Sequence, residues 1–323
     1  MVNWVQVAQQ QLVHRLARRA GLRRHAVDVD GAGTVITIWM PKRKLPGVEK
    51  TKKKEAKRDT AGRLSIVLLH GFAGDGIFTW ALQVGALAKH YDVYVPDLLF
   101  FGGSTSPAGG GRSPAFQAEC VAAALRLLGV ARCAVVGFSY GGFVAFRMAE
   151  THPGLVASVI ATGSLVDMPR SAGDAMLRRV GAASFAELLL PRDVAGLRSL
   201  FAAGTHGKWW FPDRVLKDYL KLMMFNRKER EELLEALVIN DEDAAAPSFR
   251  QDVLLLWGEK DSIFTMELAS GLKERLGKKA ELRSISDAGH LVMLERPRVF
   301  NRCLREFLLR QPCTTTTTTG ASL

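Results

Sequence analysis

Six short apolar runs separated by helical patterns constrain the fold of this 323-residue chain more than any other feature. They are SIVLLHG, DVYVPD, CAVVGFS, VASVIATG, DVLLLWG and AELRSIS, beginning at residues 65, 92, 133, 156, 252 and 280. Their hydrophobicity is continuous rather than alternating, which indicates strands that are covered on both faces. Strands of this kind alternating with helices are typical of a parallel sheet built from βαβ crossovers. The sequence therefore predicts an α/β fold.

The other segments divide the chain around this core. We expect an amphipathic basic helix over 1–24, a first core part over 25–163, a helical lid insertion over 164–250, a second core part over 251–311 and a disordered Thr-rich tail over 312–323. Residues 26–30 and 34–40 are expected to pair as an antiparallel hairpin. The charged segment 41–60 lacks periodicity and predicts a solvated surface loop, with a lipid-binding patch as the alternative.

Charge and composition exclude several classes of protein. The net charge is +12, and residues 1–60 hold 14 Lys and Arg against 5 Asp and Glu, so the basic charge is concentrated there. Because no nucleic-acid module or zinc-finger spacing accompanies it, we expect no nucleic-acid partner. The four cysteines are too scattered for a metal site or a disulfide scaffold. Without a long apolar run or a secretory signal, the chain is expected to be soluble and cytoplasmic.

The N-terminal segment allows three interpretations. Apolar residues recur at three- and four-residue steps over 2–22, and five arginines cluster at the end of this pattern. The helix could pack on the core, lie on an anionic membrane interface or act as an organelle transit peptide. Peripheral membrane association and organelle targeting therefore both stay open.

Ser139 is the predicted nucleophile. It lies in GFSYGG, residues 137–142, directly after a buried strand and before a helical segment. This is the GxSxG pattern in its expected strand–turn–helix setting. The turn is sharp, so side chains at Gly137 and Gly141 would collide with neighbouring backbone.

A serine hydroxyl needs a base, and His290 is the predicted one. It follows the strand at 280–286 and precedes the closing helix, so it belongs to the carboxyl edge of the sheet. Asp261 follows the strand at 252–258 and is predicted to orient His290 and to stabilise its imidazolium form. Glu259 is the competing carboxylate, whereas Asp287 is interpreted as a turn residue.

The backbone amides of Phe72 and Tyr140 are the predicted oxyanion donors, because one donor typically follows the nucleophile and another comes from the loop after an earlier strand. His70 and Asp97 are interpreted as structural residues. This chemistry requires no metal and no organic cofactor.

Five motifs, LLHGF, PDLLFFGGS, GFSYGG, WGEKD and DAGH, occur in this order over residues 65–309. Together they resemble the α/β-hydrolase family, closest to plant hydrolases related to the monoacylglycerol lipases and to the meta-cleavage carbon–carbon bond hydrolases. The resemblance implies a mostly parallel eight-stranded sheet with helices on both faces and an inserted helical lid. Relatives that hydrolyse epoxides or haloalkanes carry aspartate at the position of Ser139. Phe100 and Phe101 depart from the usual PDLxGxGxS motif.

The insertion suggests a substrate class. It is rich in large apolar groups, and Trp209, Trp210 and Met223 are its candidate substrate contacts. The leading hypothesis is a serine hydrolase, a carboxylesterase or lipase type of enzyme, that cleaves a lipid-like or apolar acyl ester through an acyl-enzyme. The alternatives are a meta-cleavage carbon–carbon bond hydrolase, a slow-turnover small-molecule receptor and an inactive scaffold.

Overall fold

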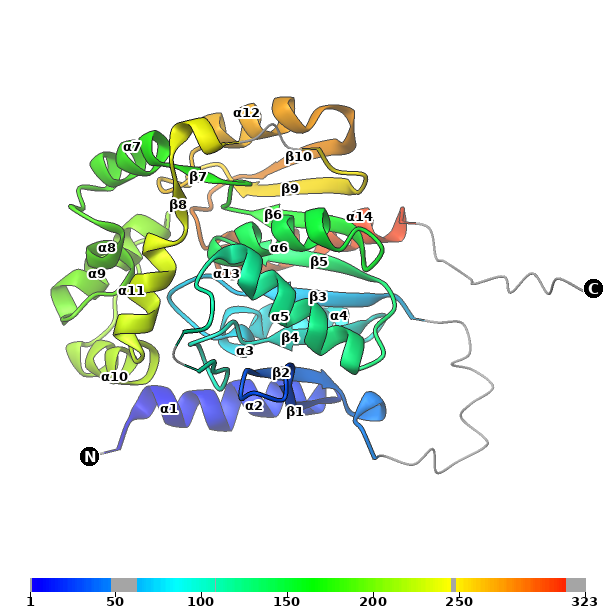
Figure 1. Cartoon of the computed structure of the whole chain (residues 1–323). Coiled ribbons are helices and arrows are strands. Elements are labelled where there is room, and N and C mark those ends of the chain that lie inside the picture. The colour runs from blue at the N-terminus through cyan, green and yellow to red at the C-terminus, as the bar shows by residue number, and fades with distance from the viewer. Residues whose placement is uncertain (1, 48–62, 108, 245–247, 312–323) are drawn as a thin grey trace, which may run out of the picture.

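The computed structural model describes residues 2–47, 63–107, 109–244 and 248–311. Within these ranges one sheet has the strand order β1-β2-β4-β3-β5-β6-β9-β10 (Figure 1). The strands are β1 (Leu22–Asp28), β2 (Val35–Pro41), β3 (Ser65–Leu69), β4 (Asp92–Pro96), β5 (Cys133–Phe138), β6 (Val156–Thr162), β9 (Asp252–Gly258) and β10 (Ala280–Ile285). β2 is antiparallel to both of its neighbours, and the other pairs are parallel. The predicted mostly parallel sheet of eight strands is confirmed.

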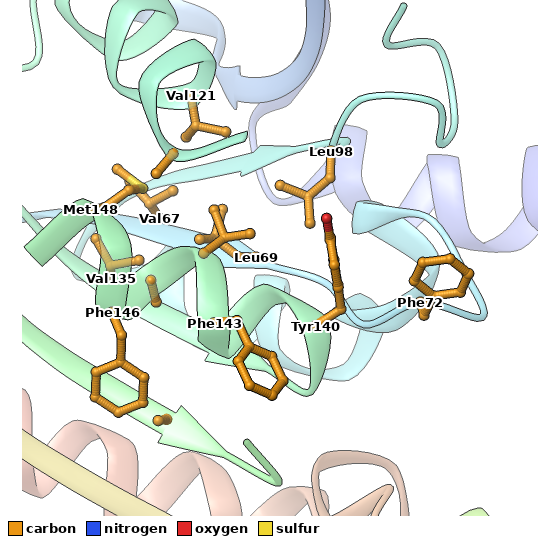
Figure 2. Packing of buried hydrophobic residues seen from close by; sticks show 14 of the residues in the cluster. Val67, Leu69, Phe72, Leu98, Val121, Val135, Tyr140, Phe143, Phe146 and Met148 are labelled. Carbon is orange, nitrogen blue, oxygen red and sulfur yellow. The ribbon is translucent and has the colours of Figure 1, made fainter. Parts of the chain in front are cut away.

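Helices cover both faces of the sheet. One apolar cluster contains residues of α5 (Pro114–Leu127), α6 (Tyr140–Thr151) and α12 (Met266–Leu276). The opposite cluster contains residues of α2 (His14–Arg19), α4 (Ala81–Leu87) and α14 (Pro297–Leu309). Figure 2 shows Phe143, Phe146 and Met148 of α6 close to Val67 of β3 and Val135 of β5. Full burial of each such side chain contributes roughly 1.5–3 kcal/mol, so the two clusters hold the helices in place.

We call residues 164–250 the lid, because those of them that the structure describes lie over the end of the sheet that carries the predicted nucleophile (Figure 1). The lid helices are α7 (Arg170–Val180), α8 (Phe185–Leu189), α9 (Val194–Gly204), α10 (Asp213–Met223) and α11 (Arg227–Glu235). The sequence predicts a helical lid, but the structure shows that the lid also contains strands. Two short strands, β7 (Met168–Pro169) and β8 (Val238–Ile239), pair in parallel because the chain enters and leaves the lid side by side.

The N-terminal helix is shorter than expected. It comprises α1 (Trp4–Ala8), a π-helical turn over Gln9–Val13 and α2. Gly21, at φ 84°, terminates it, and β1 begins at Leu22 rather than at residue 26. Leu22 is 1% exposed and pairs with Pro41, so burial and strand pairing override the helical pattern there. The expected loop over 41–60 includes a 3₁₀ turn at Lys42–Lys44, and from residue 48 on it lies outside the described residues, as does the tail over 312–323.

Short elements complete the described parts of the chain. They are α3 (Gly76–Thr79) and α13 (Val292–Glu295), with 3₁₀ turns at Asp241–Asp243 and Gly277–Lys279. α3 follows the loop after β3, and α13 follows the loop after β10. Both therefore begin at the carboxyl edge of the sheet, where functional groups gather in folds of this class.

Candidate active site

Ser139 occupies a strained turn between β5 and α6. Its backbone has φ 51° and ψ −120°, a conformation that non-glycine residues rarely adopt. A Cβ atom at Gly137 would lie 2.4 Å from the Gly141 carbonyl oxygen, and one at Gly141 would lie 2.5 Å from the His70 carbonyl oxygen. Both contacts are with backbone, so only glycine fits at these two positions. The expectation for this turn agrees with the geometry.

The structure brings His290 and Asp261 together. The imidazole Nδ1 lies 2.9 Å from Oδ2 of Asp261, and both residues are buried. The other carboxylate oxygen accepts the backbone N–H groups of Ile263 and Phe264, each at 2.9 Å. The carboxylate is therefore held by three donors. Because Nδ1–H is donated to it, Nε2 is the nitrogen that can accept a proton.

The competing carboxylates do not reach His290. Glu259 accepts a hydrogen bond from Ser284 Oγ at 2.9 Å, and Asp287 pairs with Arg296 at 2.8 Å. The interpretation of Asp287 as a turn residue agrees with its φ of 52°.

Three residues around the His290 ring escaped the sequence reasoning. The rings of Phe138 and Phe264 lie 4.8 and 5.7 Å from it, centroid to centroid. Gly163 has φ 56°, and a Cβ atom there would lie 2.5 Å from Nδ1 of His290. The signal that could have identified Gly163 is its place at the carboxyl end of an apolar strand, on the same edge as the predicted triad.

Ser139 and His290 both line one cavity of about 670 Å³. Phe72 and Tyr140 line it too, with their rings edge to face 5.5 Å apart, side by side in Figure 2. Tyr140 is the first residue of α6, so its N–H has no partner within the helix. Within the described ranges the Phe72 N–H makes no hydrogen bond either. Two unused backbone donors thus belong to the cavity that contains the predicted nucleophile.

His70 and Asp97 hold the loops behind these donors. His70 donates from Nδ1 to the Gly71 carbonyl at 2.7 Å, and its Nε2 accepts the Leu98 N–H at 2.9 Å. Complete burial lowers the pKa of His70 to about 4, so the ring is neutral. Asp97 accepts the N–H groups of Gly76 and Gly103. Burial, and then the charge of Asp75, raise the pKa of Asp97 to about 7.

Glu295 is a further residue that the sequence reasoning missed. Its carboxylate accepts the N–H of Gly289, next to His290, at 2.7 Å. It also accepts the N–H groups of His206 and Gly207 in the lid, at 2.8 and 2.9 Å. One side chain of α13 therefore joins the loop that carries His290 to the lid.

The three candidate substrate contacts fall in different places. Trp209 lines the cavity. Trp210 is 73% exposed and Met223 is 3% exposed, and neither lines the cavity. The other lid residues that do line it include Met176, Phe185, Leu188, Leu200, Phe211 and Leu234. Residues of the N-terminal helix, among them Trp4 and Leu12, also line it, although they lie more than 120 residues before Ser139.

In the part of the chain that the structure describes, no group of three or more His, Cys, Asp or Glu side chains could hold a metal ion. None of the helices there is both long enough and apolar enough to pass through a bilayer.

Comparisons with known proteins show what this geometry is similar to. The family described as alpha/beta hydrolase fold matches residues 65–188. Epoxide hydrolase 3 of Xenopus tropicalis is 25% identical over 265 residues, which are 75% of this chain and 71% of the relative. The 2-hydroxy-6-oxononadienedioate/2-hydroxy-6-oxononatrienedioate hydrolase of Burkholderia vietnamiensis is 25% identical over 77% of this chain and 88% of its own length.

The solved structures agree on the fold. A membrane phospholipase A, described as a bacterial virulence factor, superposes with a TM-score of 0.73 at 24% identity, over 94% of this chain and 91% of its own. Sheet order, turn geometry and family match therefore coincide, and the chain has the α/β-hydrolase fold.

Proposed function

We propose that this protein is a serine hydrolase that cleaves carboxylic esters with an apolar acyl group. The observation that carries the proposal is the lining of the cavity that contains Ser139 and His290. Among the described residues that line it there is no Asp, Glu, Lys or Arg. An unpaired charge is costly to remove from water, so a neutral apolar substrate fits this cavity best.

The proposed mechanism uses four groups. His290 Nε2 takes the hydroxyl proton of Ser139 as the oxygen attacks the acyl carbon, and the carbonyl π electrons move onto its oxygen. The amides of Phe72 and Tyr140 stabilise that oxyanion. The protonated His290 gives its proton to the leaving alcohol, which leaves an acyl-enzyme. Water, deprotonated by His290, then releases the carboxylic acid and regenerates Ser139.

Carbon–carbon bond hydrolysis of the meta-cleavage type is the second candidate. The Burkholderia relative is named for a dioate substrate, which carries two carboxylates. A second carboxylate needs a cation in the pocket, and Arg147, Arg178 and Lys208 do not line it. Arg147 instead pairs with Glu150 and Asp167. The described lining of the cavity therefore favours the ester.

The test combines active-site labelling with a panel of substrates. The wild-type protein is expected to react with a fluorophosphonate probe, and Ser139→Ala is expected to lose this labelling. Turnover of p-nitrophenyl esters should rise toward longer acyl chains because the cavity is apolar. Asp261→Asn should lower kcat by about 10⁴-fold, as loss of the orienting carboxylate does in serine hydrolases, whereas Asp287→Asn should keep it.

Four results would count against the proposal. Absence of labelling in folded wild type would mean that the triad is not assembled, and labelling with a single turnover would favour a receptor. Equal turnover of short and long esters would remove the apolar substrate class. Faster cleavage of a vinylogous 1,5-diketone acid than of any ester would favour the carbon–carbon hydrolase.

A further inference from the structure

The N-terminal helix lines part of the cavity and is attached to the rest of the protein at two points. The backbone N–H of Trp4 donates to the carboxylate of Asp218 in α10 at 2.8 Å. Gln9 is buried within the π-helical turn, and its Nε2 donates to Asp75 at 2.5 Å. Asp75 belongs to the loop after β3 and caps α3. The helix therefore joins the lid to the core, and Figure 1 shows α1 beside α10.

The N-terminal helix contributes to a group of exposed apolar side chains. Among the described residues ten large apolar side chains are exposed, and five of them line the cavity: Trp4, Leu12, Leu16, Leu82 and Trp209. Three more lie within three residues of these in the sequence: Val2, Val7 and Trp210. Single exposed apolar residues are ordinary, but a group of eight indicates an interaction surface. We call these eight residues the apolar rim.

Unpaired positive charge lies beside the rim. The side chains of Arg15, Arg18 and Arg19 are exposed, and within the described ranges they make no ion pair or hydrogen bond. Lys208, next to Trp209, is also exposed and makes no ion pair or hydrogen bond with any described residue. An apolar surface flanked by free cations is the pattern that binds an anionic membrane interface. A second copy of this chain would bring like charges together instead.

Arg15 and Arg18 also border a second, polar recess of about 570 Å³. Its lining includes His14, Arg15, Arg18, Arg23, Arg24 and Trp39. Among the described residues none of these arginines forms a salt bridge with a carboxylate. A recess lined by arginines next to an apolar surface suits an anionic lipid headgroup, because guanidinium groups bind phosphate oxygens in pairs.

We propose that the N-terminal helix and the Trp209–Trp210 segment dock the protein on an anionic membrane surface, with the mouth of the catalytic cavity facing the lipid. An apolar ester then passes from the bilayer into the cavity without crossing water. Membrane binding stands independently of the proposed function, and only the delivery of the ester rests on it. The occupant of the surface is a bilayer with anionic headgroups.

The test is co-sedimentation of the full chain with vesicles. Wild type is expected to bind phosphatidylcholine vesicles that contain phosphatidylglycerol, to bind pure phosphatidylcholine much more weakly, and to detach as salt rises. Arg15→Gln with Arg19→Gln should weaken binding by about fivefold for each arginine removed. Val7→Glu with Trp210→Glu, which lie on the rim but do not line the cavity, should abolish binding.

Matched controls come from the opposite edge of the sheet. Leu127 is 63% exposed at the end of α5, and Arg132 is exposed just before β5 begins. Leu127→Glu and Arg132→Gln should bind vesicles as wild type does. In all variants, fluorophosphonate labelling and turnover of a water-soluble short ester should match wild type, which separates loss of docking from loss of folding or catalysis.

Each contrary result is decisive. The docking proposal is overturned if wild type ignores anionic vesicles, binds neutral and anionic vesicles equally, or if Val7→Glu with Trp210→Glu binds normally. If wild type is a dimer that does not bind vesicles, and Val7→Glu with Trp210→Glu is a monomer, the apolar rim would be assigned to contact with a second copy. Loss of labelling with vesicle binding retained would instead count against the proposed function and leave the docking surface standing.

Discussion

His70 shows what one buried side chain contributes to the site. It connects the loop that carries Phe72 to the loop that carries Leu98, and it is fully buried between them. A histidine in the HG pair of such a sequence could be mistaken for a catalytic base. Its two hydrogen bonds are satisfied in the neutral form, so its role is to hold the loop of the proposed oxyanion donor.

The lowered pKa of His70 predicts a pH dependence of stability. In the unfolded chain the ring becomes protonated as pH falls below its usual pKa of 6.5. In the folded chain burial lowers this pKa to about 4. The unfolded state thus binds more protons in this window, and stability that is present above about pH 6.5 is lost as pH falls toward about 4. The loss amounts to up to about 3 kcal/mol.

The measurement is urea unfolding of wild type and His70→Asn across this range. The advantage of wild type over the variant should shrink between pH 6.5 and pH 4. The difference between the two proteins is needed because Asp97, with its raised pKa, acts in the opposite direction and gains stability as pH falls through about 7. A difference that stays constant with pH would show that His70 is not neutral in the fold.

At the scale of elements, the Phe100–Phe101 pair explains how the lid is held to the core. Arg230 of α11 is 1% exposed, and its guanidinium lies 4.1 Å from the centroid of Phe101. It also lies 4.5 Å from the ring of Phe225 and donates to the carbonyl oxygens of Phe100 and Met223. The departure from the PDLxGxGxS motif therefore provides an aromatic surface for a buried arginine.

Arg230→Ala is expected to lower the free energy of unfolding by about 3–5 kcal/mol, because the carbonyls of Phe100 and Met223 each lose a donor and two rings lose a cation. Arg192→Ala is the control. The Arg192 side chain is 80% exposed and lies 3.8 Å from Glu231, so its loss should cost under about 1 kcal/mol. Denaturant unfolding and limited proteolysis compare the two variants with wild type. If α11 is cleaved in Arg230→Ala at the wild-type rate, Arg230 does not hold the lid to the core.

At the scale of the whole molecule, the cavity is a product of assembly. The N-terminal helix, the loop after β3, the turn at Ser139, the lid and the His290 loop all contribute to its lining. Of these parts, only the turn at Ser139, the loops of Asp261 and His290, and part of the lid carry local sequence signals. A ligand that fills the cavity contacts all of these parts and should stabilise them together.

A non-hydrolysable long-chain alkyl ether is therefore expected to raise the stability of the whole chain. At a hundred times its Kd it should add about 2.7 kcal/mol, because it binds the folded state alone. Ser139→Ala should show the same rise, since binding depends on apolar contact rather than on the nucleophile. Thermal unfolding with long- and short-chain ethers at equal concentration measures this stabilisation. Equal shifts in Tm for the two ethers would mean that the apolar cavity does not bind the alkyl chain of the ligand.

Local patterns sufficed for the central strands and for the loops that carry Asp261 and His290, which the structure brings together. Continuous apolar runs identify buried strands, and residues that follow them lie at one edge, which is how Asp261 and His290 were placed. The same reasoning failed at Leu22, where periodicity continued but pairing with β2 prevailed. It also failed for Met223, whose apolar character reflects packing inside the lid rather than contact with a substrate.

The sequence by itself determined the central strands, the glycines around Ser139 and the order of Ser139, Asp261 and His290 along the chain, because each depends on a few consecutive residues. The tertiary structure alone decided that Trp4 and Leu12 border the same cavity as His290, and that Glu295 joins the His290 loop to the lid. Except for the local bond between Glu295 and Gly289, these contacts join segments that are 88 or more residues distant in the sequence. Their formation depends on how layers pack around a common core, and no local pattern of residues records that packing.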